Sequence, residues 1–147
     1  MDAAVEEWEA LVGGGAVAQA RKPTAADVNE IARRHGILKG KWLLFPKTPA
    51  EADAAWAAVV AAVAGGALCP SAKVSSISPE EGGHVLCAYT VDYLDSGDVM
   101  RVCAALQRAL PPLADRRMLY KPDIFTHLGI YGGNPYAITP TVHRASL

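Results

Sequence analysis

Polar residues that could bind a ligand gather between residues 120 and 141, in a segment rich in proline, glycine and aromatic residues. Pro122, Pro135 and Pro140 restrict the backbone, and the glycines allow bends that other residues resist, so an irregular segment can keep one shape. Such a segment can direct polar groups toward a common point beside an apolar wall, as in small-ligand sites. With one lysine from a neighbouring predicted strand, the candidate ligand-binding residues are Lys73, Lys121, Asp123, Thr126, His127, Tyr131, Asn134 and Tyr136.

The chemistry that these residues favour is the binding of an anion. Lys73 and Lys121 offer positive charge to a phosphate, and the tyrosines offer rings on which a base can stack. The predicted ligand is therefore a nucleotide, an RNA or another small anionic molecule. A structural interpretation stays open beside it, because surface lysines are usually solvated and Asn and Tyr often hold loop backbones. In that interpretation Asp123 caps a helical turn that runs through Thr126.

Two further functions stay open. An enzyme could use Asp123 and His127 as an acid/base pair, because residues four apart share one face of a helical turn. The chain carries no nucleophile motif or metal-binding motif to support that chemistry. The sequence therefore favours a binding protein and predicts no cofactor and no metal site. As the other alternative, an exposed helical face or the N-terminal helix around Trp8 could dock a protein partner.

The composition indicates a single soluble domain. The 147 residues are 51% hydrophobic and 20% charged with a net charge of −1, so there is no overall attraction to nucleic acid or to anionic membranes. No apolar run reaches the roughly 20 residues that span a bilayer, and the first residues are acidic where a secretory signal would be basic. Three cysteines without metal-site spacing fit a reducing compartment. We therefore expect a cytoplasmic protein that does not associate with membranes.

Helical periodicity and capping residues predict four helices, over residues 5–12, 24–36, 48–64 and 95–110. The third has the clearest start, because Thr48 can cap it and Pro49 suits its first turn. Its expected buried stripe is Trp56, Val59, Val60 and Val63. A Gly/Ala/Gln stretch follows the first helix and predicts a flexible connector. Residues 1–22 are thus expected to form an N-terminal helix and connector, and residues 23–147 a single α+β domain.

Short apolar segments between these helices predict the strands of a sheet. They cover residues 41–45, 72–77, 85–91 and 117–121, and the first of them has apolar residues on both faces. Residues 73–91 read as a hairpin that turns at Ser-Pro-Glu-Glu-Gly-Gly, which favours antiparallel pairing. The order of elements predicts an α+β fold, with helices packed on one face of a mainly antiparallel sheet. A parallel α/β sheet is the alternative.

Four segments resemble the uncharacterised family typified by the basophilic-leukemia-expressed protein (BLES). The segments are Trp-Leu-Leu-Phe at 42–45, Ala-Lys-Val-Ser at 72–75, His-Val-Leu-Cys-Ala-Tyr-Thr at 84–90 and Tyr-Lys-Pro-Asp-Ile-Phe-Thr-His-Leu-Gly-Ile-Tyr at 120–131. The resemblance implies a fold similar to that of cap-binding translation initiation factor 4E. Such a fold has a curved antiparallel sheet, helices on its convex face and a concave face open to ligand.

The same resemblance does not lead us to expect cap recognition. The initiation factor holds its cap between two tryptophans on loops. Here Trp8 lies near the N-terminus, Trp42 in a predicted strand and Trp56 in a predicted helix. We therefore expect an anion-binding module without true cap recognition, and fold alone does not carry the function.

Overall fold

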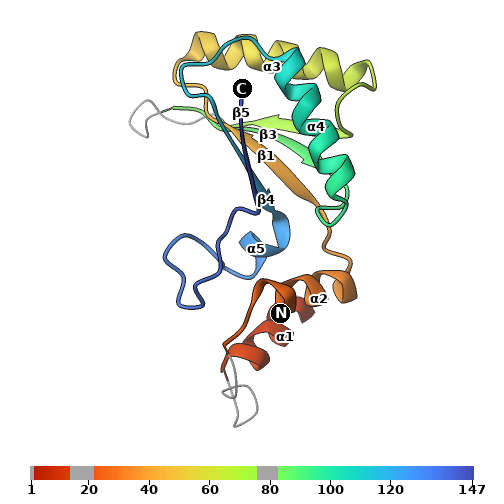
Figure 1. The fold of residues 1–147 in the computed structure, drawn as a ribbon, viewed down its shortest axis with the longest axis vertical. Helices are drawn as coiled ribbons and strands as arrows, with labels where there is room; N and C mark the ends of the chain where they lie inside the picture. The colour runs from red at the N-terminus through yellow and green to blue at the C-terminus, as the bar shows by residue number, and fades with distance from the viewer. Residues whose placement is uncertain (1, 14–21, 76–82) are drawn as a thin grey trace.

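A computed structural model describes residues 2–13, 22–75 and 83–147 (Figure 1). Most of the predicted connector after the first helix, and most of the predicted hairpin turn, lie outside the described residues. In chain order the elements are α1 (Ala3–Gly13), α2 (Ala25–His35), β1 (Gly40–Leu44), α3 (Pro49–Ala64), β2 (Ser71–Val74), β3 (Leu86–Thr90), α4 (Ser96–Ala109), β4 (Arg117–Pro122), α5 (Asp123–His127) and β5 (His143–Ser146). None of the helices described here is long and apolar enough to cross a membrane.

The strands form one open sheet in the order β2-β3-β1-β4-β5. Each strand pairs antiparallel with its neighbours, which confirms the α+β class and the antiparallel hairpin of β2 and β3. The parallel alternative is wrong. The edge strand β5 was not predicted, because its four residues follow an irregular proline-containing segment and show no strong alternation of apolar residues.

The helices begin where their capping residues predict. The side chain of Thr48 accepts a hydrogen bond from Glu51 N at the start of α3, and Asp95 accepts one from Asp98 N at the start of α4. At the end of α2, Gly36 adopts a left-handed φ of 66° that closes the helix. Local sequence chemistry is sufficient to place these ends.

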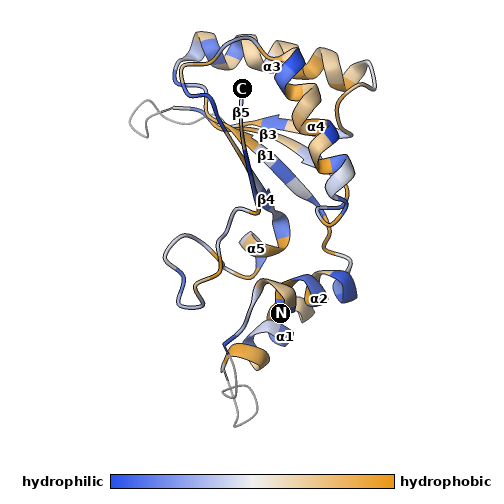
Figure 2. Cartoon of the chain, in the orientation of Figure 1, coloured by the Kyte–Doolittle hydropathy of each residue, from blue (hydrophilic) through white to orange (hydrophobic). Residues whose placement is uncertain are grey.

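The buried stripe of α3 differs from the prediction. Ala52, Ala55 and Val59 face the core, which confirms Val59 of the predicted stripe, whereas Val60 is 44% exposed. Small alanines on this side allow close approach to the sheet. Trp56 and Val63 pack half-buried against the edge of the core. Because α3 is hydrophobic along most of its length (Figure 2), hydropathy alone did not distinguish its two sides.

Helices α3 and α4 cover one face of the sheet. The register places Trp42, Leu44, Leu86 and Met118 on that face, and all four are fully buried. The indole Nε1 of Trp42 donates a hydrogen bond to the Val99 carbonyl of α4 at 2.9 Å. The core therefore lies between these two helices and the inner side of the sheet.

A buried polar pair on this face depends on a glycine. The hydroxyls of Thr90 and Tyr120 lie 2.5 Å apart, and both residues are buried. A Cβ atom at Gly40 would lie 2.2 Å from the Tyr120 hydroxyl oxygen and 2.6 Å from the ring carbon that carries it. Gly40 is thus the residue in β1 that leaves room for the tyrosine side chain.

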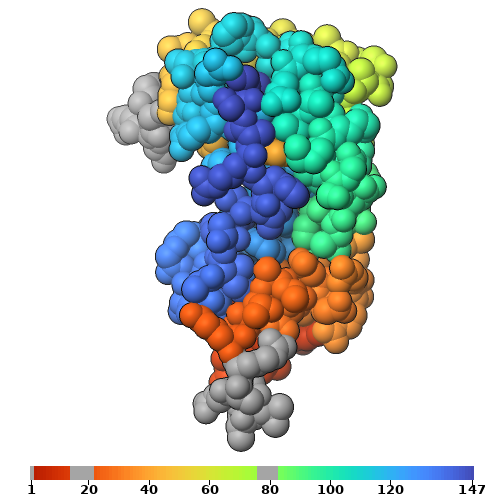
Figure 3. Space-filling view, viewed as in Figure 1, coloured from red at the N-terminus to blue at the C-terminus, as the bar shows by residue number. Residues whose placement is uncertain are grey.

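Helix α1 packs on the same core as the rest of the chain. Trp8 is 2% exposed, and its ring meets the ring of Tyr136 edge to face at a centroid distance of 5.1 Å. Glu7 binds both Arg34 and His35 of α2, at 2.7 Å in each case. Figure 3 shows α2 lying against the C-terminal segment at one end of the molecule. Residues on both sides of the predicted boundary at residue 22 therefore share one core.

Candidate functional site

The face of the sheet that α3 and α4 leave uncovered carries a group of basic residues. Along a strand, side chains alternate between the two faces of the sheet. Lys41, Leu43 and Leu119 therefore lie on this second face, together with the residues opposite them on the neighbouring strands. Most of its side chains are half-buried or exposed, in contrast to the first face, which is buried along β1, β3 and β4. We call this surface the lysine face, which consists of Lys41, Leu43, Phe45, Lys73, Cys87, Tyr89, Arg117, Leu119, Lys121 and Arg144.

The register brings Lys73 and Lys121 to the same face, although they are on strands β2 and β4. Lys41 of β1 lies opposite Tyr89 of β3 on one side and opposite Lys121 on the other. Lys73 lies opposite Cys87, one step along the same face. Both predicted ligand-binding lysines and a third lysine that was not predicted, Lys41, therefore lie on one face.

Aromatic rings lie among these ammonium groups. The Nζ atoms of Lys41 and Lys73 lie 5.7 and 5.8 Å from the centroid of the Tyr89 ring. The Nζ atom of Lys121 lies 4.4 Å from the centroid of the Tyr131 ring, which is itself 53% exposed. Tyr89 is also the main cause of a raised pKa at Lys73. The cations thus lie over the two tyrosine rings, and Tyr131 adds exposed aromatic surface beside Lys121.

The charges on the lysine face are only partly neutralised. Lys41 binds Asp123 through an Nζ to Oδ1 contact of 2.6 Å. Lys73, Lys121 and Arg144 make no ion pair with any described residue. Burial, followed by the nearby charge of Lys41, lowers the pKa of Lys121. An anion placed beside Lys121 would relieve that unfavourable positive charge.

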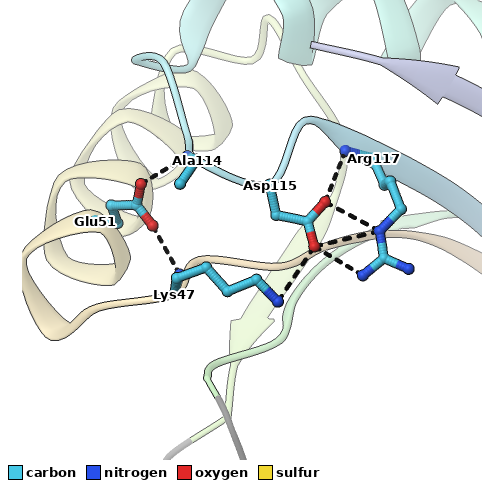
Figure 4. A network of polar contacts seen from close by, with 5 residues as sticks. All are labelled: Lys47, Glu51, Ala114, Asp115 and Arg117. Atoms are coloured by element: carbon cyan, nitrogen blue, oxygen red, sulfur yellow. Dashed lines mark hydrogen bonds and ion pairs between the residues drawn. The ribbon is translucent and has the colours of Figure 1, made fainter.

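Arg117 at one end of the face is held by a rigid polar network (Figure 4). The Asp115 carboxylate accepts hydrogen bonds from the Arg117 guanidinium and also lies 3.3 Å from Lys47 Nζ. Arg117 is the main cause of a pKa at Asp115 well below the usual range. Glu51 fixes the same loop, because its carboxylate accepts from Lys47 N and Ala114 N at 2.7 Å each. Arg117 therefore lies at the edge of the lysine face, and its charge is already paired with Asp115.

The family described as Basophilic leukemia-expressed protein Bles03 matches residues 7–129. The chain belongs to this family. The predicted family resemblance is thereby confirmed, and the Bles03 match spans Lys41, Lys73, Tyr89 and Lys121. It also begins within α1, before the predicted boundary at residue 22.

The remaining predicted residues of this Bles03 protein are engaged elsewhere. Asp123 does not cap a helical turn; Pro122 precedes α5, no side chain caps it, and the Asp123 carboxylate binds Lys41 instead. His127 Nε2 lies 3.0 Å from Asp2 Oδ2 of the N-terminal segment. Asp123 and His127 thus contact different partners. Thr126 is exposed on α5.

Asn134 and Tyr136 stabilise the irregular C-terminal segment. The Asn134 amide nitrogen donates to the carbonyls of Tyr131 and Ile138, and its amide oxygen accepts from the backbone nitrogens of Tyr136 and Ile138. The Tyr136 ring packs on Trp8. The Asn134 side chain thus holds the loop backbone, as the structural interpretation of the sequence proposed, whereas the Tyr136 ring packs in the core.

Sequence reasoning missed Lys41, Tyr89 and Arg144. Lys41 and Tyr89 were assigned to buried strands, and the strand of Arg144 was not predicted. A stricter analysis of alternation in Lys-Trp-Leu-Leu-Phe would have separated Lys41 from Trp42 and Leu44. Only strand register, however, shows that the three lysines share one face. No group of three or more His, Cys, Asp or Glu side chains suited to a metal ion gathers in the described parts of the chain.

Proposed function

We propose that the lysine face of this Bles03-family protein binds an anionic ligand of the nucleotide or RNA class, without true cap recognition. The observation that carries the proposal is the placement of Lys73 and Lys121 on one face, beside tyrosine rings and without carboxylate partners among the described residues. Phosphate supplies the missing negative charge, and a base supplies a flat ring for the tyrosines. The lowered pKa of Lys121 supports this, because a bound anion stabilises its charged form.

We further propose that the fold is similar to that of translation initiation factor 4E, with a curved sheet whose convex face carries the helices. The antiparallel strand order, and the packing of α3 and α4 on a single face, support this likeness. Trp8 and Trp42 are 2% and 0% exposed, so neither side chain can sandwich a base. Trp56 belongs to α3, which lies over the opposite face. These positions support a ligand other than a methylated cap.

The test is a thermal-shift panel of ATP, GTP, inorganic phosphate and sulfate, followed by titration calorimetry with the nucleotide that gives the largest shift. A ligand that binds only the folded state must raise the melting temperature. Hydrogen bonds to charged groups contribute about 1.5–3 kcal/mol, so Lys73→Gln and Lys121→Gln should each weaken binding about tenfold or more. Arg108→Gln is the matched control, because it removes the same charge from exposed α4. Equal affinity in all three variants would end the proposal.

The alternative functions have less support. A protein-docking role for α1 would need Trp8 to be accessible, and it is buried. An acid/base pair would need Asp123 and His127 to meet, and each binds another residue. The three cysteines are free thiols, which supports the expectation of a reducing compartment such as the cytoplasm.

A further inference from the structure

The cations of the lysine face extend across the whole width of the sheet. One line of neighbouring residues runs through Lys73, Cys87, Leu43, Leu119 and Arg144, each from a successive strand from β2 to β5. Neighbouring strands lie about 4.8 Å apart, so the backbone positions of Lys73 and Arg144 are separated by roughly 19 Å. A cation therefore stands at each end of the line.

The middle of this line is apolar. Cys87 is 5% exposed, and Leu43 and Leu119 are half-buried, so an apolar strip separates the two terminal cations. The adjacent line adds Lys41 and Lys121 beside this strip. Neither Lys73 nor Arg144 has an ion-pair partner within the described ranges. A ligand complementary to this pattern carries repeated negative charges along its length and flat apolar groups between them.

We propose that the ligand is a single-stranded nucleic acid several nucleotides long, which crosses the sheet from β2 to β5. This inference rests on the proposed function and adds to it that Arg144 binds a phosphate distant from the one at Lys73. In a single strand the phosphates repeat while the bases are free to cover Leu43 and Leu119 and to stack on tyrosine rings. A duplex hides its bases, and an acidic peptide offers charge without flat rings.

The width of the face gives an approximate site size. Along the axis of a stacked strand the phosphates repeat about every 3.4 Å, so roughly 19 Å accommodates at most about six nucleotides. Lys73, Lys121 and Arg144, which have no ion-pair partner in the part of the chain that the structure describes, are available to neutralise phosphates. Each phosphate neutralised on a single strand contributes about −0.7 to the slope of log K against log salt, so the expected slope is about −2.

The test is fluorescence anisotropy of a fluorescein-labelled hexauridylate, with UMP, hexaglutamate and an RNA hairpin as competitors. Arg144 is exposed on the edge strand β5, so Arg144→Gln should leave the protein folded. It should weaken hexauridylate binding several-fold and reduce the salt slope by about 0.7, without changing UMP binding. Arg108→Gln, which removes an exposed charge from α4, should change neither value.

The outcomes separate this inference from the function on which it rests. If UMP binds in a manner that depends on Lys73 and Lys121 but hexauridylate binds no tighter, the nucleotide site stands and the extended strand is refuted. Equal displacement by hexaglutamate, or a salt slope unchanged by Arg144→Gln, would also refute it. Absence of binding by UMP, hexauridylate and the anion panel would overturn both proposals.

Discussion

Removal of the Trp8 side chain should destabilise the whole domain. Trp8 is 2% exposed, lies in the main hydrophobic cluster and meets Tyr136 edge to face. It therefore joins a residue near the N-terminus to the irregular C-terminal segment. If α1 were a detachable arm, as the sequence prediction of a separate segment 1–22 implied, the same change would have little effect on stability.

The size of the effect follows from burial. Substitution of a buried tryptophan by alanine costs about 3–5 kcal/mol. In a domain of this size, 1 kcal/mol corresponds to about 3 °C in melting temperature. Trp8→Ala should therefore lower the melting temperature by roughly 9–15 °C. Deletion of residues 1–22 should cost at least as much, because it also removes Ala4 from the core and exposes the Tyr136 ring.

The measurement is urea and thermal denaturation followed by far-UV circular dichroism, a signal that does not depend on the deleted indole. Trp8→Phe keeps most of the buried surface and should lose less stability. Glu9→Ala is the matched control, because Glu9 is an exposed residue of the same helix. A truncated chain that melts within about 2 °C of the full-length chain would refute the assignment of α1 to the common core.

Two other changes test the sheet. Gly40→Ala places a Cβ atom 2.2 Å from the Tyr120 hydroxyl and should destabilise the fold by about 1–3 kcal/mol or more, measured by urea denaturation; Gly66→Ala, where a Cβ would meet no atom within 4 Å, serves as a strained but uncrowded comparison. Burial lowers the pKa of Lys121 in the folded state, so the unfolded chain binds more protons between the folded and unfolded pKa values. The free energy of unfolding of the wild type should therefore rise relative to that of Lys121→Met as the pH approaches 10 from below. A difference in unfolding free energy between the two proteins that does not change with pH would contradict the burial of this charge.

Local chemistry determined most of the elements of this protein, with the edge strand β5 as an exception. Helix ends could be predicted at Thr48 with Pro49, at Asp95 and at Gly36. Capping and left-handed turns depend only on residues that are close in the chain. Strand β4 and the antiparallel β2-β3 hairpin were likewise predictable from short apolar segments. The buried side of α3 was not, because a helix that is hydrophobic on both sides does not indicate which side meets the sheet.

Tertiary structure alone decided which residues meet on the lysine face. Lys41, Lys73 and Lys121 are distant in the chain, and their common direction results from the register of three strand pairings. A shift of one residue in any pairing would turn a lysine toward the helices, and no local pattern encodes that alignment. The different contacts of Asp123 and His127 also result from tertiary structure. Asp123 binds Lys41 and His127 binds Asp2, and both partners come from distant parts of the chain. The sequence thus specified the basic and aromatic residues, and the sheet brought them together.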